Sequence, residues 1–191
     1  SFTESQIHLF GPLVLGVIAA VGGGTVRDII LDWRIFWVAD QIYVWLALVA
    51  SLISFYTFRA LRQKSIHRIF LYVDGMATAL FAIQATSKSW DLGFGLPVAP
   101  VILGVVTAIG GGLIRDVLVN NETLLINREL YAMPVVLGST VFAFILAFLP
   151  EHQFVGSLVC IGIIFSIRAA AIHWGIEVPR WAILEEVKSE E

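Results

Sequence analysis

Long apolar stretches alternate with short polar segments along this chain, and the pattern predicts helices that cross a membrane. A bilayer core of about 30 Å needs ~20 mostly apolar residues of helix. Six stretches come close to that length: Leu9–Val26, Ile42–Phe58, Ile69–Thr86, Leu96–Ile114, Leu130–Leu149 and Phe154–Ile172. Most charged residues fall between them, and the tryptophans lie near their ends, where interface anchors are expected. The sequence therefore predicts an all-α, polytopic membrane helix bundle.

The composition supports a membrane location and excludes several other classes of protein. Only 14% of the 191 residues are charged and 58% are hydrophobic, whereas soluble domains carry roughly 25% charged residues. Six apolar helices would leave a soluble protein without polar faces to cover its core. A basic patch with interleaved aromatics is not found, so nucleic acid is not an expected partner. The single cysteine, Cys160, lies in an apolar run and is expected to be a small buried hydrophobic residue.

The distribution of basic residues predicts the orientation in the membrane. We call the side of residue 1 the near side. Near-side segments hold nine basic residues, namely Arg59, Arg62, Lys64, Arg68, Arg115, Arg128, Arg168, Arg180 and Lys188. Far-side segments hold three, namely Arg27, Arg34 and Lys88. The positive-inside rule then predicts that the near side, which includes the C-terminus, faces the cytoplasm.

One internal repeat is plain in the sequence. Gly22–Leu31 matches Gly110–Val119 at an offset of 88 residues, and Val14–Val17 matches Ile102–Val105 at the same offset. Three predicted spans separate equivalent points, and an odd number of spans reverses the direction of the chain. The two copies are therefore predicted to form an inverted repeat, an architecture common among transport proteins.

The repeat is incomplete at its start. The span Ile69–Thr86 precedes the second glycine segment, and its counterpart would lie before residue 1. We expect a native chain with an upstream helix, giving seven helices as three plus three plus one; loss of that helix is the alternative. Within one transmembrane domain, repeat 1 is assigned to 1–66, repeat 2 to 67–150, and the final helix and tail to 151–191.

The triple glycines, Gly22–Gly24 and Gly110–Gly112, are the candidate ion pathway. Each glycine weakens a helix by roughly 1 kcal/mol relative to alanine. Close helix packing is one interpretation. The other is a kink or break at mid-membrane, whose freed carbonyls could bind a dehydrated monovalent cation. Thr25 and Thr107 could add oxygen ligands, although such residues commonly bond their own helix. A phosphate-binding loop would need a preceding strand and a Gly-Lys-Ser/Thr ending, which the sequence does not provide.

Charged residues flank the glycines and form the second candidate group. Arg27 with Asp28, and Arg115 with Asp116, follow the two triplets. Helix neighbours one apart do not face each other, so each charge is expected to have a separate partner. Capping and snorkelling at the membrane surface is one role; gating pairs or charge at the mouth of a pathway is the other. Asp74 lies inside the third span, where an ionisable group is functional or paired, and Arg115 is its candidate partner.

The sequence offers no sign of enzyme chemistry. The four histidines are scattered over termini and loops, without metal-binding spacing such as His-Glu-x-x-His. A nucleophile–base pair is not evident either. The chain is therefore expected to be neither an enzyme nor a cofactor-binding protein.

The paired Gly-Gly-Gly-x-x-Arg-Asp motifs, the span that holds Asp74-Gly75 and the closing helix resemble the prokaryotic branch of the trimeric intracellular cation (TRIC) channel family. The same group has also been labelled as putative glycine transporters. The resemblance runs from Phe10 to Trp174, and the family's first helix has no match. It implies a seven-helix subunit, a homotrimer, and a K⁺- and Na⁺-permeable pore inside each subunit, lined by kinked glycine segments. Eukaryotic members bind inositol lipids through a Lys-Glu-Val motif that this sequence lacks.

We therefore expect a monovalent cation channel in a prokaryotic inner membrane, in contact with membrane lipids. A secondary transporter of a small solute such as glycine is the alternative, and a structural scaffold is a more distant third.

Overall fold

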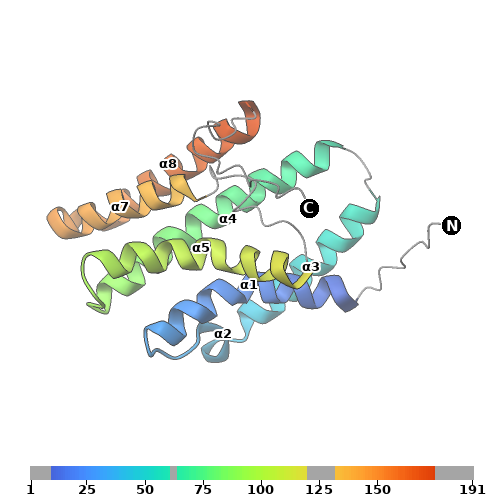
Figure 1. Cartoon of the computed structure of the whole chain (residues 1–191), viewed down its shortest axis with the longest axis horizontal. Coiled ribbons are helices and arrows are strands. Elements are labelled where there is room, and N and C mark those ends of the chain that lie inside the picture. Colours follow the sequence, from blue (N-terminus) through green and yellow to red (C-terminus); the bar gives the residue numbers. More distant parts are fainter. Residues whose placement is uncertain (1–9, 61–63, 120–131, 175–191) are drawn as a thin grey trace, which may run out of the picture.

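The structure is a computed structural model that describes residues 10–60, 64–119 and 132–174. These residues form a bundle of long helices, with α4 and α5 lying between the α1–α3 side and the α7–α8 side (Figure 1). In chain order the elements are α1 (Phe10–Ile30), α2 (Phe36–Ala39), α3 (Ile42–Ala60), α4 (Lys64–Asp91), α5 (Val98–Val119), α7 (Met133–Phe148), the 3-10 turn η2 (Pro150–His152) and α8 (Gln153–Trp174).

Each predicted span corresponds to one of the six long helices. Four are long and apolar enough to cross a membrane, within Phe10–Ile30, Arg68–Asp91, Val98–Val119 and Pro150–Trp174. Two shorter apolar helices, Ile42–Thr57 and Met133–Phe148, account for the others. The predicted class, an all-α polytopic membrane bundle, is therefore confirmed. The predicted starts at Leu9 and Leu130 lie outside the described residues.

Helix α4 is longer than its predicted span. The apolar run ended at Thr86, but α4 continues to Asp91 and so carries Lys88 at its end. The chain then reverses through a turn in which Gly93 and Gly95 have positive φ angles of 64° and 54°. Glycine adopts that conformation without a steric penalty, so the turn can lead directly into α5.

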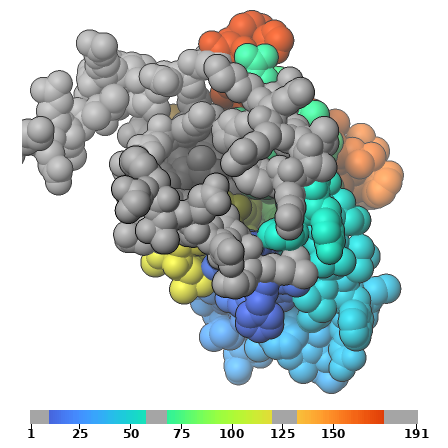
Figure 2. All heavy atoms as spheres, turned by 90° about the vertical axis from the view of Figure 1, so that its right-hand side faces the viewer, coloured from blue at the N-terminus to red at the C-terminus, as the bar shows by residue number. Residues whose placement is uncertain are grey.

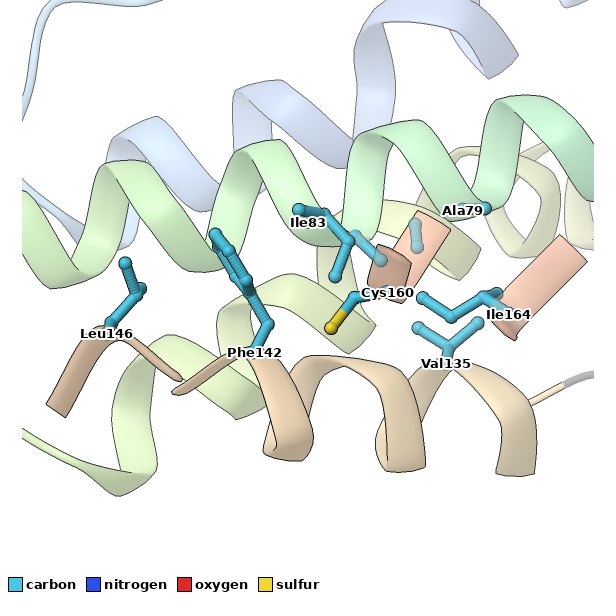
Figure 3. Close-up of a cluster of buried hydrophobic side chains, with 9 residues drawn as sticks. Ala79, Ile83, Val135, Phe142, Leu146, Cys160 and Ile164 are labelled. Carbon is cyan, nitrogen blue, oxygen red and sulfur yellow. The ribbon is translucent and has the colours of Figure 1, made fainter. Parts of the chain in front are cut away.

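The hydrophobic core lies where α4, α7 and α8 meet, with a contribution from α5 (Figure 3). Small residues on α4 and α8 let the helix backbones approach closely, as is usual in membrane bundles. Phe142 and Ile164 are among the largest fully buried side chains. The buried members are Ala79, Ala82, Ile83, Ala108, Val135, Phe142, Leu146, Cys160 and Ile164. The expectation that Cys160 is a buried hydrophobic residue is confirmed.

The internal repeat is visible in the packing. A Cβ built on Gly16 of α1 would lie 2.8 Å from Ser51 Cβ on α3. At the equivalent place, a Cβ on Gly104 of α5 would lie 3.0 Å from Ser139 Oγ on α7. Gly104 and Ser139 each lie 88 residues after Gly16 and Ser51, so the second contact is the repeat equivalent of the first. The pair α1–α3 therefore corresponds to the pair α5–α7, and an end-on view shows α1 and α3 on the side opposite α8 (Figure 2).

Candidate functional site

The glycine triplets lie where α1 and α5 cross. Both helices run without interruption through them, from Phe10 to Ile30 and from Val98 to Val119. A break in either helix is therefore wrong for this structure, which shows close packing at the triplets; a kink without a break stays a prediction. The physical reason is that glycine lowers helix propensity only modestly, whereas it allows two backbones to touch.

The contacts between α1 and α5 at this crossing come in pairs that the internal repeat relates to each other. A Cβ built on Gly23 would collide with the carbonyl oxygen of Thr107, and one built on Gly111 would collide with that of Ala19. Thr107 is the repeat equivalent of Ala19, and Gly111 is that of Gly23. Residue 19 opposes 111 and residue 23 opposes 107, so the two helices are antiparallel. The inverted repeat therefore has its centre in the glycine crossing.

The two threonines predicted as ligands satisfy their hydroxyls within their own helices. Thr107 Oγ1 donates to the Leu103 carbonyl at 2.6 Å, and Thr25 Oγ1 donates to the Val21 carbonyl at 2.7 Å. Thr25 Oγ1 also accepts a hydrogen bond of 2.9 Å from Trp37 Nε1. Each hydroxyl keeps some acceptor capacity.

A cluster of charged residues around the buried Asp28 lies at the far end of the bundle. Asp28 is completely buried, and its Oδ1 lies 2.8 Å from Arg27 Nε and 2.8 Å from Lys88 Nζ. Its Oδ2 accepts a hydrogen bond of 2.9 Å from the backbone N–H of Phe36. The guanidinium also lies over the Phe36 ring, 5.8 Å from its centroid. One carboxylate therefore joins α1, the start of α2 and the end of α4.

Two expectations for this pair are wrong. Adjacent charges on a helix were expected not to face each other, but Arg27 and Asp28 bond each other because the arginine side chain is long enough to fold back; Asp28 has Lys88 as a separate partner in addition. Snorkelling to the membrane surface is also wrong, because Arg27 is only 5% exposed and lies inside the bundle. Lys88 was not predicted as a partner of Asp28, although its position at the same far end of the bundle was a usable signal.

The near end holds two further ion pairs. Arg115 Nη2 lies 2.8 Å from Asp116 Oδ1, so these two helix neighbours also bond each other. Asp74 Oδ2 lies 3.0 Å from Arg168 Nη2, so α4 is tied to α8. Within the described residues Asp74 is not ion-paired with Arg115, and that prediction is wrong. A Cβ on Gly75 would lie 3.3 Å from Arg168 Nε, so the missing side chain leaves room for the arginine to cross α4.

These observations define the class of protein. The molecule is a polytopic helical membrane protein with an inverted repeat, a glycine crossing at its centre, and ion pairs at both ends. Inverted repeats of this kind are typical of transport proteins.

Comparison with known proteins gives the family. The family model described as "Glycine transporter" matches residues 3–59 and 71–147. The UPF0126 inner membrane protein YadS of Escherichia coli (strain K12) is 35% identical over 177 residues, which are 92% of this chain and 84% of the relative. A UPF0126 membrane protein of Vibrio cholerae is 31% identical over 179 residues, covering 91% of this chain and 72% of that protein.

Solved structures agree with this assignment. A structure that describes conductance through TRIC cation channels has a TM-score of 0.80 and 32% identity, covering 93% of this chain and 86% of that one. The TRIC trimeric intracellular cation channel orthologue of Rhodobacter sphaeroides has a TM-score of 0.75 and 28% identity, covering 88% and 96%. The chain belongs to the prokaryotic branch of the trimeric intracellular cation channel family.

Proposed function

We propose that this protein is a cation channel that conducts K⁺ and Na⁺ through a pathway inside each subunit of a homotrimer. The similarity over nearly the whole chain to TRIC cation channels, with a TM-score of 0.80, is the observation that carries this proposal. The trimer follows by analogy with the orthologue of Rhodobacter sphaeroides.

The glycine crossing is the proposed position of the pathway, lined by Gly22–Gly24 and Gly110–Gly112. In the described conformation α1 and α5 touch there, so the pathway is closed at this level and opens when the two helices separate. Backbone carbonyls such as those of Ala19 and Thr107 would then face the ions. Because the helices are unbroken, these carbonyls are already hydrogen-bonded and offer only their second lone pair. A cation would therefore pass partly hydrated.

The charged residues at the two ends are proposed to control access to this pathway. At the far end, Lys88 and Asp28 link α4 to α1 at 2.8 Å, so separation of α1 from its neighbours strains or breaks this contact. At the near end, Arg115 and Asp116 sit on α5 itself, where they place charge beside the proposed exit. Asp74 is proposed to act by fixing α4 against α8 through its ion pair.

A transporter of a small solute such as glycine is the second candidate function, and the description of the family model favours it. Such a transporter would use the same crossing as an alternating gate. The two candidates differ in a measurable way, because a channel passes many ions per opening and a transporter saturates.

The deciding experiment places the purified full-length protein in a planar bilayer under a KCl gradient. Discrete unitary steps that reverse toward the K⁺ equilibrium potential support the channel. Saturable glycine uptake into proteoliposomes, without unitary current, overturns it. Gly23→Ala should lower the unitary conductance because its methyl group narrows the open pathway, even though the same group pushes α5 away from α1 in the closed conformation. Gly162→Ala is the matched control, since a Cβ there meets nothing within 4 Å.

We propose the near side, with the C-terminus, as the cytoplasmic side. The support is the excess of basic residues in near-side segments. An inner membrane is the proposed location, by analogy with the inner membrane protein of Escherichia coli.

A further inference from the structure

A groove of about 960 Å³ opens at the far end of the bundle, where α4, η2 and α8 come together. It is separate from the glycine crossing. Its inner wall is apolar and includes Phe81, Phe142 and Ile161, of which Phe142 also belongs to the buried core (Figure 3). Its mouth is polar and includes Lys88, with two exposed carboxylates beside it.

The length of the groove matches one leaflet of a bilayer. Along α4 its lining runs from Leu80 to Asp91, which is 12 residues or 11 helical steps, a rise of about 16 Å at ~1.5 Å per step. Half of a hydrocarbon core of about 30 Å is ~15 Å. Trp33 at the mouth marks the interfacial level, as tryptophan commonly does in membrane proteins. An amphiphile with one leaflet-long chain and a polar head therefore fits this shape.

The charges at the mouth select the head group. Asp91 on α4 and Glu151 on η2 both line the groove, and neither forms an ion pair among the residues that the structure describes. Lys88 contributes the one positive charge; its ammonium is bound to Asp28 but has three donors in total. Two carboxylates beside one ammonium disfavour a purely anionic head group. They suit a head group that carries a phosphate for Lys88 and a primary amine for the carboxylates.

We propose that this groove binds a phospholipid of the phosphatidylethanolamine type. Its acyl chain lies along α4 and α8, its phosphate faces Lys88, and its ammonium donates hydrogen bonds to Asp91 and Glu151. A choline head group fits less well because its quaternary nitrogen has no N–H donor. The inference needs only the membrane location, and it stands whether the protein is a channel or a transporter.

Other occupants are less consistent with the structure. The repeat relates α4 to any helix that precedes α1, and α4 packs on α5 and α7. Since α5 and α7 are the repeat equivalents of α1 and α3, a helix that precedes α1 would pack on α1 and α3. That position is on the other side of the molecule, so the helix would leave the groove open. A second copy of the chain is the remaining rival, and the experiment below separates it from lipid.

Native mass spectrometry of the purified full-length protein provides the first test. The protein is equilibrated with equal amounts of phosphatidylethanolamine, phosphatidylglycerol and phosphatidylcholine with identical acyl chains. We expect the ethanolamine lipid to be retained about 5-fold more than either of the others, which corresponds to ~1 kcal/mol. The double variant Asp91→Asn/Glu151→Gln should lose this preference. Asp40→Asn, an exposed far-side carboxylate outside the groove, should keep it.

Photocrosslinking locates the lipid. Phe154 lines the groove and Phe148 does not, and both are 75% exposed, so they are matched positions for p-benzoylphenylalanine. After irradiation in vesicles of the same three lipids, we expect the adduct at Phe154 to be enriched in the ethanolamine lipid relative to the adduct at Phe148. Equal lipid composition at the two positions overturns the proposal. So does a crosslink from Phe154 to a second copy of the chain, or an equal loss of preference in Asp40→Asn.

Discussion

Replacing Gly23 with alanine tests whether the glycine crossing is as tight as the structure shows. The new Cβ would lie 3.2 Å from the backbone nitrogen of Gly111 and closer still to the carbonyl oxygen of Thr107. Both neighbours are backbone atoms of a helix, so no side-chain rotation can relieve the contact. Helix α5 as a whole has to move away from α1.

The size of the effect follows from two opposing terms. Overpacking in a well-packed region typically costs about 1–3 kcal/mol, and the rigid backbone partners place this site near the upper end. Alanine gains roughly 1 kcal/mol of helix propensity over glycine. Gly162→Ala on α8 gains the same propensity and meets nothing within 4 Å. The difference between the two variants therefore isolates the crossing, at ~3 kcal/mol.

The measurement is the melting temperature of purified protein in one detergent. For a chain of this size, 1 kcal/mol corresponds to roughly 2–4 °C, so Gly23→Ala should melt about 6–12 °C below Gly162→Ala. Gly111→Ala should behave alike, because the repeat gives it the same kind of contact with Ala19. The double variant should lose less than the sum, since the first alanine already separates the helices.

Equal melting temperatures for Gly23→Ala and Gly162→Ala would refute the reasoning. A large loss at Gly23 with none at Gly111 would refute the symmetry of the crossing. Strictly additive losses would show that the two sites do not share one interface.

Three further predictions concern charge and topology. Asp28→Asn leaves the buried Arg27 and the partly exposed Lys88 without a carboxylate and should destabilise the protein by about 3–5 kcal/mol, measured as a fall in melting temperature that Asp40→Asn does not show. Gly75→Ala should displace Arg168 and weaken the link between α4 and α8, seen as faster proteolysis in detergent; an unchanged rate would contradict it. A cysteine at Gln63, outside the described residues, should resist an impermeant thiol reagent in intact cells, and its labelling there would overturn the proposed orientation.

Features that depend on local stretches of sequence were predicted well. The six helices follow from apolar runs, because crossing a bilayer requires a length of helix that can be counted directly. The hydrocarbon core of the bilayer also requires backbone polar groups to be hydrogen-bonded within the protein, which excludes most spanning structures other than helices. The inverted repeat follows from Gly22–Leu31 and Gly110–Val119, since an odd number of intervening spans fixes their relative direction.

Sequence reasoning failed where the answer depended on which helices touch. The triple glycines are compatible with both a break and a close contact, and only the position of Thr107 against Gly23 distinguishes them. The partner of Asp74 is Arg168, 94 residues away, and it is set by the packing of α8 on α4.

The sequence by itself determined the class of protein, the number of apolar helices and the two-fold relation between its halves, because these depend on composition and spacing along the chain. The tertiary structure decided the partners of each buried charge, the closed glycine crossing and the groove at the far end. These depend on contacts between helices that lie far apart in the sequence, and the same local sequence pattern is compatible with many different contacts. Asp28 shows the difference: its position in α1 could be read directly, whereas its contact with Lys88, 60 residues later, exists only because α4 extends to the same end of the bundle.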